Sequence, residues 1–526
     1  MRKIHIGSRG SELALWQAHF IQGKLNELGV ETEIKIIKTQ GDNFFNRSFS
    51  KLEGKGFFTK ELEESLLEGS IDLAVHSLKD LPTQSTEGLK IAALSYREDP
   101  SELLLIHPQS VNLHEVFALP PRAKVGTSSP RRASQLLSHR PDLDIDELRG
   151  NVPTRVQKLR DGDYDAILLA KAGIKRLGLD LTGLHVEELS PVELIPAPGQ
   201  GVLALQIRES DPELEEKLKL IHHPDVEELV GVERTILSLF EGGCHLPLGV
   251  YCKRESDKYM VWACKADSQE NFPDRLYLAQ DSLDNLAKNV FEKFEKKETK
   301  ITSVFITREL NQGGYLQGYL NSKNIRLDGK SLIRTFPIIH KMDTSVFHNV
   351  DWIFFNSKNG VEYFFALDPQ LKPDIKIGVI GRGSETALRE FGREADFVGE
   401  TSDTTRVARK FARLVEGKTV LFPQSKDSLR TIQNGLDPNL TKTIDLPLYE
   451  TEAEKNVDIF YFDIIIFTSP SNVDSFMAEN LIEPGQKVIA IGKSTAAKIR
   501  EYQIEPQAIP YTPDEMGLAE AIFGML

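Results

Sequence analysis

The stretch Asp72–Pro82, DLAVHSLKDLP, has the pattern that decides the fold of the first half of this chain. An apolar run of strand-forming residues ends directly in Lys79 and Asp80, so a buried strand would deliver charged side chains at its end. Helical patterns such as Glu12–Leu28 and Thr59–Glu68 alternate with further runs of this kind, which predicts an α/β fold. The predicted strands are Lys3–Ile6, Glu33–Lys38, Ile71–His76, Lys90–Leu94, Leu103–Ile106, Ala123–Gly126, Ala166–Leu169 and Gly201–Gln206.

The composition is that of an acidic globular protein with several domains. The chain has 526 residues, of which 40% are hydrophobic, and a formal net charge of −14. At roughly 150 residues per domain, this length predicts about three to five domains. The negative charge argues against nonspecific binding of nucleic acid. Three cysteines are too few for a disulfide framework, and no apolar run reaches the roughly 18 residues of a membrane helix. We therefore expect a cytoplasmic protein without membrane contact.

A charged run at 292–300, EKFEKKETK, follows a smaller α+β region and is the best candidate for a linker between two halves. The second half contains an internal echo. Phe355–Ser357 resembles Phe467–Ser469 at an offset of 467 − 355 = 112, and Ile380–Arg382 resembles Ile491–Lys493 at 492 − 381 = 111. Nearly equal offsets predict two similar α/β lobes, with chance similarity between buried strands as the alternative.

Cationic and hydroxyl side chains gather just after the predicted strands of the first half. Taken alone, each such loop can be an ordinary capped helix or a surface ion pair. Together, in an acidic protein, they predict a site for a ligand with several carboxylates. The residues concerned are Arg9, Ser11, Lys79, Asp80, Thr127, Ser128, Ser129, Arg131, Arg132, Arg149, Arg155 and Arg176, with Lys55 in a glycine-flanked loop.

Cys244 follows two glycines and precedes His245, so its thiol can be presented to a ligand and ionised. The alternative is a buried, inert cysteine. A zinc site built from Cys244, Cys252, His222 and His223 fits no standard ligand spacing. The segment Ile491–Thr495 lacks the first glycine of a phosphate-binding loop, and Gly381–Gly383 lacks the third glycine of a dinucleotide fingerprint.

Six ordered motifs within residues 1–300 resemble those of porphobilinogen deaminase, the hydroxymethylbilane synthase family. They are Ile6–Ser11, His76–Pro82, Gly126–Arg132, Leu148–Val152, Pro198–Gly201 and Glu241–Cys244. The resemblance implies two α/β domains similar to periplasmic binding proteins, with the active cleft between them, and a small third α+β domain. It also implies an enzyme that joins four porphobilinogens head to tail and releases ammonia at each step.

The same resemblance assigns roles to individual residues. Cys244 is expected to carry a covalent dipyrromethane cofactor, and Asp80 is expected to be the catalytic carboxylate, assisted by Lys79. The residues expected to hold the cofactor are Lys79, Asp80, Thr127, Ser128, Ser129, Arg131, Arg132 and Arg155. Those expected to bind substrate are Arg9, Ser11, Lys55, Phe58, Arg149, Arg155, Arg176 and Gln200. No metal is expected.

The second half resembles uroporphyrinogen-III synthase through four shorter motifs: Val304–Arg308, Phe355–Val361, Leu446–Thr451 and Phe467–Val473. That family has two α/β lobes joined by a two-stranded ladder, and it closes hydroxymethylbilane into a ring with inversion of the last pyrrole and loss of water. Tyr449 is expected to act as an acid toward the departing hydroxyl. Candidate substrate contacts are Ser357, Thr386, Thr468 and Ser469.

The sequence thus predicts a monomeric bifunctional enzyme that makes uroporphyrinogen III from porphobilinogen. Two alternatives stay open: an active deaminase whose second half has lost synthase activity, and a two-lobed binding protein for a small anion. The expected domains are 1–97 with 195–215, 98–194, 216–298, 301–338 with 447–526, and 341–445.

Overall fold

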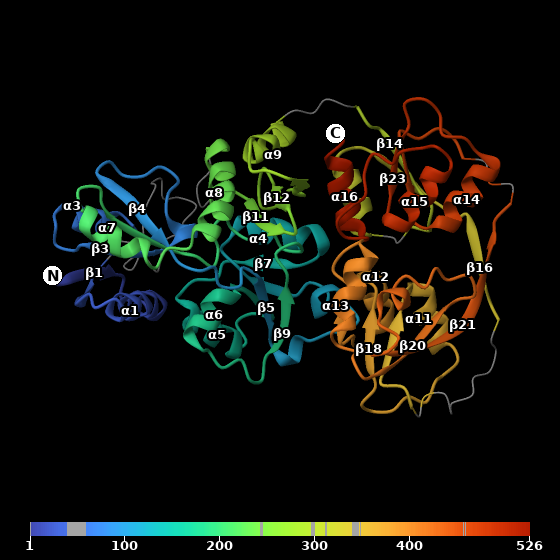
Figure 1. The fold of residues 1–526 in the computed structure, drawn as a ribbon, viewed down its shortest axis with the longest axis horizontal. Coiled ribbons are helices and arrows are strands. Elements are labelled where there is room, and N and C mark those ends of the chain that lie inside the picture. The colour runs from blue at the N-terminus through green and yellow to red at the C-terminus, as the bar shows by residue number, and fades with distance from the viewer. Residues whose placement is uncertain are drawn as a thin grey trace. The chain divides into compact units, whose positions relative to one another are not determined.

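The computed structural model describes residues 2–38, 59–241, 246–295, 300–310, 313–338, 347, 349–455, 457 and 459–526. The chain divides into two compact units, Met1–Lys297 and Glu298–Leu526 (Figure 1). This division falls inside the charged run expected to be a linker. However, helix α9 (Leu286–Glu295) takes up the first four residues of that run, because Leu286, Val290 and Phe294 recur at helical spacing and are buried.

The first sheet of unit 1 has the strand order β2-β1-β3-β10-β4. β1 is parallel to β2 and β3, whereas β10 is antiparallel to β3 and β4. Each strand expected here forms within two residues of its predicted bounds. The elements are β1 (Ile4–Ser8), α1 (Glu12–Glu27), β2 (Thr32–Ile36), α3 (Lys60–Leu67), β3 (Leu73–Ser77), β4 (Leu89–Leu94) and β10 (Leu203–Arg208).

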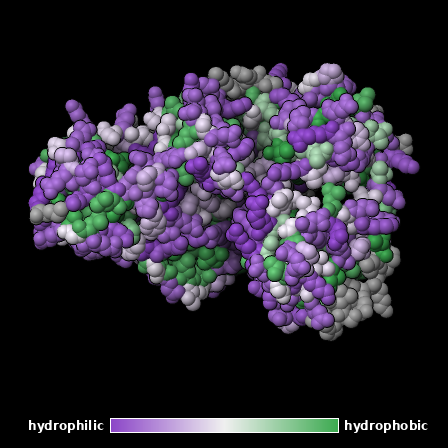
Figure 2. All heavy atoms as spheres, viewed as in Figure 1, coloured by the Kyte–Doolittle hydropathy of each residue, from purple (hydrophilic) through white to green (hydrophobic). Residues whose placement is uncertain are grey.

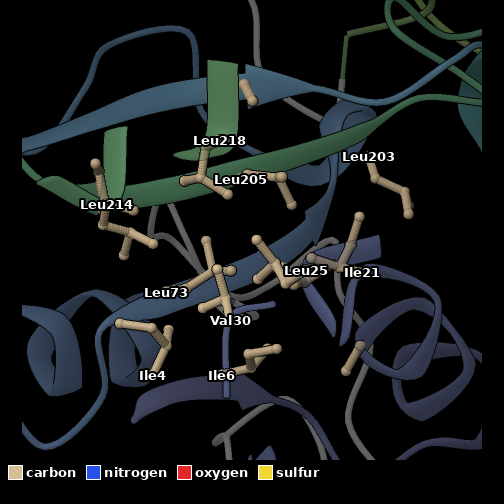
Figure 3. Packing of buried hydrophobic residues seen from close by; sticks show 14 residues of the cluster. Ile4, Ile6, Ile21, Leu25, Val30, Leu73, Leu203, Leu205, Leu214 and Leu218 are labelled. Atoms are coloured by element: carbon tan, nitrogen blue, oxygen red, sulfur yellow. The ribbon is translucent and has the colours of Figure 1, made fainter. Parts of the chain in front are cut away.

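Helices α1 and α7 (Pro212–Lys219) close the core of this sheet (Figure 3). Ile21 and Leu25 lie one turn apart on α1, and Leu214 and Leu218 lie one turn apart on α7. All four side chains are buried in the same cluster as the apolar residues of the strands. α7 thus packs on the first sheet as one helix, although the domain boundary expected at 215/216 divides it.

The second sheet of unit 1 has the order β7-β6-β8-β5-β9. The chain enters it after β4 and returns to the first sheet before β10, so two segments connect the two α/β domains. Strands β7 and β9 lie at the edges and were not predicted. The elements are β5 (Glu102–Ile106), β6 (Lys124–Gly126), α4 (Pro130–His139), β7 (Asp144–Asp146), α5 (Val152–Arg160), β8 (Ala166–Ala170), α6 (Lys171–Leu177) and β9 (His185–Leu189).

The third part of unit 1 is a small α+β assembly, as expected. Helix α8 (Pro224–Leu239) packs on β11 (Leu248–Glu255) and on α9. β11, β12 (Lys258–Lys265) and β13 (Asp274–Gln280) form an antiparallel sheet in chain order. Helix α8 ends five residues before Cys244, so it leads directly into the segment that carries this thiol.

Unit 2 consists of two α/β lobes joined by an antiparallel ladder, which confirms the expected architecture. One sheet is β15-β14-β22-β23 and the other is β16-β21-β20-β17-β18-β19. The ladder pairs β16 with β21, from Ile333 opposite Ala453 to Pro337 opposite Tyr449. The strands are β14 (Ser303–Ile306), β15 (Arg326–Gly329), β16 (Ile333–Pro337), β17 (Trp352–Phe355), β18 (Lys376–Val379), β19 (Phe397–Val398), β20 (Thr419–Ser425), β21 (Lys442–Ala453), β22 (Ile464–Phe467) and β23 (Lys487–Ala490). The helices are α10 (Tyr315–Ser322), α11 (Lys358–Phe365), α12 (Arg382–Glu390), α13 (Thr404–Ala412), α14 (Pro470–Glu479), α15 (Lys493–Glu501) and α16 (Glu515–Phe523).

The internal echo of the sequence corresponds to equivalent helix starts in the two lobes. Ser357 caps α11 with φ −161° and ψ 157°, and Ser469 caps α14 with φ −160° and ψ 159°. Gly381 and Gly492 precede α12 and α15 in the same way. A third pair, the caps Asp403 of α13 and Asp514 of α16, has the offset 514 − 403 = 111. Six equivalent caps confirm that the lobes are similar units.

The two lobes also touch each other near these caps. The backbone N–H of Ser402 donates to the carbonyl of Tyr511 over 2.7 Å, and its hydroxyl donates to the carbonyl of Pro510 over 2.6 Å. Lys493, the first residue of α15, pairs with Asp403 of the other lobe at 2.6 Å. The lobes are thus joined covalently at the ladder and in direct contact at a second place.

Hydrophilic residues cover most of the face drawn in Figure 2, which agrees with a chain in which 27% of residues are charged. Within the described ranges, no helix has the length and apolar character needed to cross a membrane.

Candidate active site

A cavity of about 100 Å³ lies between the two α/β domains of unit 1, where the loops after the strands meet. Its lining contains five of the residues expected to bind cofactor or substrate: Lys79, Arg132, Arg155, Arg176 and Gln200. Four of these five side chains are cationic. The apolar part of the wall is Leu13, Val152, Leu169, Ala170, Ala172, Gly173 and Val202.

Lys79 lines the cavity from the short turn Leu78–Asp80 at the end of β3, whereas Asp80 of the same turn is not among the lining residues. The Nζ atom of Lys79 lies 3.5 Å from Oε1 of Gln200. Burial lowers the pKa of Lys79, and the negative charge of Asp80 opposes this shift. Asp80 is exposed to solvent, and its charge acts on Lys79 and Arg155, two residues of the cavity lining. The charge of Asp80 thus partly offsets the charges of these two cations.

Arg131 and Arg132 begin helix α4, and both are bound to one buried carboxylate, Glu102 on β5. Glu102 accepts from Arg131 at 2.7 Å and from Arg132 at 2.7 and 3.1 Å. Burial alone would raise the pKa of Glu102, but the charges of Arg132 and Arg131 lower it to about 2. A second donor of Arg131 is used by the carbonyl of Ile195. Arg132 lines the cavity, whereas Arg131 is not among the lining residues.

Arg155 and Arg176 come from helices α5 and α6 of the second domain. Arg155 donates through Nε to the carbonyl of Gly150 over 2.8 Å. Burial and, to a smaller extent, the charge of Arg132 lower the pKa of Arg155 to about 10, while the charge of Asp80 opposes the shift. Nη2 of Arg176 donates to the carbonyl of Gly201 over 2.6 Å. The Nε of Arg176 is buried without a hydrogen-bond partner, so the cavity retains a donor for a ligand oxygen.

The four hydroxyl residues of the predicted site hold the backbone of its loops. Ser11 caps α1 by accepting from the N–H of Ala14. Ser129 caps α4, which has Pro130 in its first turn, and accepts from the N–H of Arg132. Thr127 accepts from the N–H of Ser129, and Ser128 donates to the carbonyl of Leu148 over 2.7 Å. These contacts fix the loop that presents the two arginines.

The remaining predicted residues lie elsewhere. Arg149 pairs with Glu147 at 2.8 Å and is not part of the cavity lining. Arg9 is half-buried just after β1 and is not part of that lining either. Lys55, Phe58 and Cys244 lie outside the described residues.

Two polar residues at or beside the cavity, Gln17 and Glu102, were not among the site residues predicted from the sequence. Gln17 lies on the buried face of α1, lines the cavity and donates from Nε2 to the hydroxyl of Ser77 over 3.0 Å. Glu102, the first residue of β5 in the second α/β domain, is fully buried. Each is a polar residue at a position where the periodic pattern requires an apolar one, and that signal could have identified both.

In unit 2, the predicted acid Tyr449 lies on β21 and its hydroxyl is 2.9 Å from that of Ser357. The ring of Tyr363 stacks on Tyr449 at 5.0 Å between centroids. Burial raises the pKa of Tyr449, and the hydrogen bond with Ser357 opposes this shift. The structure thus joins two candidates, one from each of two segments 92 residues apart.

The other synthase candidates occupy separate places. Thr468 and Ser469 follow β22 in the opposite lobe, where Thr468 donates to the carbonyl of Thr307 over 2.9 Å. Ser469 accepts from the N–H of Asn472. Thr386 is exposed on α12. Ser357 and Ser469 are equivalent helix caps, so these two candidates occupy the same position in the two similar lobes.

Two family models match the chain. Residues 4–216 match porphobilinogen deaminase, described as its dipyrromethane cofactor binding domain. Residues 330–520 match uroporphyrinogen-III synthase. The matches lie in different units of the structure.

The curated relatives are porphobilinogen deaminases. Porphobilinogen deaminase of Nitratidesulfovibrio vulgaris is 47% identical over 260 residues, which cover 49% of this chain and 81% of the relative. The deaminase of Campylobacter concisus is 40% identical and covers 56% of this chain and 96% of that relative. Among solved structures, uroporphyrinogen-III synthetase of Helicobacter pylori is 16% identical with a TM-score of 0.31, over 43% of this chain and 100% of that chain.

Proposed function

The chain belongs to the porphobilinogen deaminase family and carries a uroporphyrinogen-III synthase module in residues 330–520, and from this premise we propose how its residues perform the two reactions. Unit 1 polymerises four porphobilinogens to hydroxymethylbilane with loss of ammonia. Unit 2 cyclises that product to uroporphyrinogen III with loss of water. The cytoplasmic location and the monomeric state remain predictions.

One observation carries the deaminase proposal: the cavity between the α/β domains has four cations in its wall, and the charge of Asp80 acts on two of them, Lys79 and Arg155. Acetate and propionate side chains of pyrroles need such cations, because each carboxylate loses hydration when it is bound. The unpartnered Nε of Arg176 supports this fit, since a buried donor of this kind gains energy from a ligand oxygen.

The same residues fit a dipyrromethane, which supplies a primer to which pyrroles are added. Lys79, Arg132 and Arg155 would hold its carboxylates, and Arg131 would fix Arg132 through their shared partner Glu102. Cys244 would be the point of covalent attachment. Its place after two glycines, at the end of the segment that follows α8, supports this assignment.

Asp80 is the acid–base group of this proposal. Its carboxylate accepts the proton released when a pyrrole carbon forms the new bond, and it stabilises the positive charge that develops on ring nitrogen as ammonia departs. Lys79, whose Nζ lies 3.5 Å from Oε1 of Gln200, binds a substrate carboxylate together with that residue.

In the synthase module, Tyr449 donates its phenolic proton to the departing hydroxyl group of hydroxymethylbilane, so that water leaves. Ser357 orients this phenol through their 2.9 Å contact. Binding of the chain in a folded conformation supplies much of the remaining acceleration. Thr386, Thr468 and Ser469 remain predicted substrate contacts.

The product distinguishes the two activities. Purified protein incubated with porphobilinogen should give the type III isomer of uroporphyrinogen, whereas uncatalysed closure of the bilane gives type I. Asp80→Asn should lower porphobilinogen consumption by at least about a hundredfold, since general acid–base groups typically contribute that much. Tyr449→Phe should leave consumption unchanged and shift the product toward type I. A wild-type product that is purely type I would refute the synthase assignment.

The cofactor is tested by intact mass under denaturing conditions with peptide mapping. The Cys244 peptide should carry the added mass of two linked pyrrole units, and Cys244→Ser should lack it. Cys252→Ser is the matched control, because Cys252 is buried in β11 and should leave the adduct in place. An adduct-free wild type after incubation with porphobilinogen would contradict the proposal.

A further inference from the structure

Glu233 on α8 is a carboxylate without any access to solvent at the junction of the three parts of unit 1. It accepts four N–H groups: Arg97 Nη1 at 2.7 Å, Arg97 Nη2 at 3.2 Å, the backbone of Gly199 at 2.7 Å and the backbone of Cys252 at 2.8 Å. A buried carboxylate persists only where such donors replace its water. The donors come from the segment after β4, the loop before β10, and β11.

These contacts hold the loop Gly199–Gly201 on both sides. Gly199 donates to Glu233, and the carbonyl of Gln200 accepts from Nε of Arg97 over 3.1 Å. Gly201 has φ +90°, and a Cβ atom there would lie 2.2 Å from the carbonyl oxygen of Glu98. The backbone of the loop is therefore confined to one path by Arg97 and Glu233 together.

The same loop determines two groups of the cavity. The Gln200 side chain reaches Lys79, with 3.5 Å between Oε1 and Nζ. The carbonyl of Gly201 accepts from Nη2 of Arg176 over 2.6 Å, which leaves Nε of Arg176 as the donor for a ligand. A displaced loop would move the amide of Gln200 and the guanidinium of Arg176 at once.

We propose that Glu233 is a positioning residue of the deaminase: through Arg97 and Gly199 it fixes the loop that sets Gln200 and Arg176 for binding porphobilinogen. The inference rests on the proposed function. Glu233 touches no substrate, since it does not line the cavity. It also links the loop to α8, the helix that precedes the Cys244 segment.

The test is Glu233→Gln in the cofactor-loaded full chain. The variant keeps the size of the side chain but places an amide N–H₂ where all four neighbours are donors, so at least one contact is lost. The KM for porphobilinogen should rise about tenfold while kcat changes less than about threefold, because binding rather than chemistry is affected. Arg97→Lys keeps a cation for Glu233 but loses the planar fork that also reaches Gln200, so it should raise KM similarly.

Asp72→Asn is the matched control. Asp72 is also buried and ion-paired, with Arg208 at 2.9 Å, and it lies outside the cavity lining. This variant should lower the melting temperature and leave KM unchanged. If Glu233→Gln and Arg97→Lys only lower the melting temperature, as Asp72→Asn does, the positioning role is wrong. A wild-type chain that consumes no porphobilinogen would instead overturn the proposed function itself.

Discussion

Arg131 and Arg132 are neighbours in the sequence, yet the fold gives them different tasks. Both were predicted to bind carboxylates, and both do bind one, that of Glu102. Arg132 also lines the cavity, whereas Nη1 of Arg131 donates to the carbonyl of Ile195. Glu102 could not be assigned this partner from sequence, since it stands about thirty residues away in a run of leucines and the pairing arises only when β5 lies beside α4.

The buried side chain of His76 should make the stability of unit 1 depend on pH. Its ring is buried in β3 and its Nε2 atom lies 3.0 Å from Oε1 of Gln206. Burial lowers its pKa from 6.5 to about 4. The ring is therefore protonated at a lower pH in the folded state than in the unfolded state. The stability that depends on the neutral ring is complete above pH 6.5 and is lost as the pH falls toward 4.

At pH 5 this loss should amount to about 2 kcal/mol of unfolding free energy for unit 1. His76→Gln removes the titrating group, so the difference between wild type and variant should shrink by that amount between pH 7 and pH 5. Urea unfolding of both proteins at the two pH values measures it. Equal pH dependence of the two proteins would show that His76 does not titrate as its burial implies.

Whether a strand or helix could be predicted from the sequence depended on its composition and on its place in the fold. Strands β3 and β10 were predicted because each begins with an apolar run, LAV and LAL, and they are buried along most of their length. Strands β7 and β9 were missed, since they are short edge strands with the sequences DID and HVEEL and only pairing with a neighbour orders them. Helix α7 formed across an expected domain boundary because Leu214 and Leu218 pack on the first sheet.

The duplicated lobes allow a matched prediction for two helix caps. Ser357 and Ser469 have nearly identical backbone angles, and each accepts from the N–H three residues on. Ser357→Ala and Ser469→Ala should each reduce the stability of unit 2 by about 1 kcal/mol. Chemical unfolding with a probe in unit 2 measures both.

Only Ser357 contacts Tyr449, and its hydrogen bond lowers the pKa of that phenol against the effect of burial. Ser357→Ala should therefore raise the phenol pKa further, as seen by ultraviolet titration, and Ser469→Ala should not. A shift of the Tyr449 pKa in both variants would mean that the contact is not responsible.

At the scale of the whole molecule, the two units have separate hydrophobic cores. Leu168 of β8 and Leu421 of β20 are both fully buried, and their clusters contain residues of one unit each. Calorimetry should therefore show two unfolding transitions. Leu168→Ala and Leu421→Ala should each cost about 2–5 kcal/mol and lower the temperature of a different transition. A single transition lowered equally by either variant would show that the units unfold together.

The α/β architecture, the duplicated lobes, the two families and the cationic character of the site could all be predicted from the sequence. These features depend on local periodicity and on motifs that each lie within about ten residues. The folded structure was needed to show that Lys79, Arg132, Arg155 and Arg176 share one cavity, that Glu102 binds Arg132, that Glu233 binds Arg97, and that Ser357 contacts Tyr449. Those contacts join segments far apart in the chain, and their energies come from burial and from paired charges that exist only once the domains have packed.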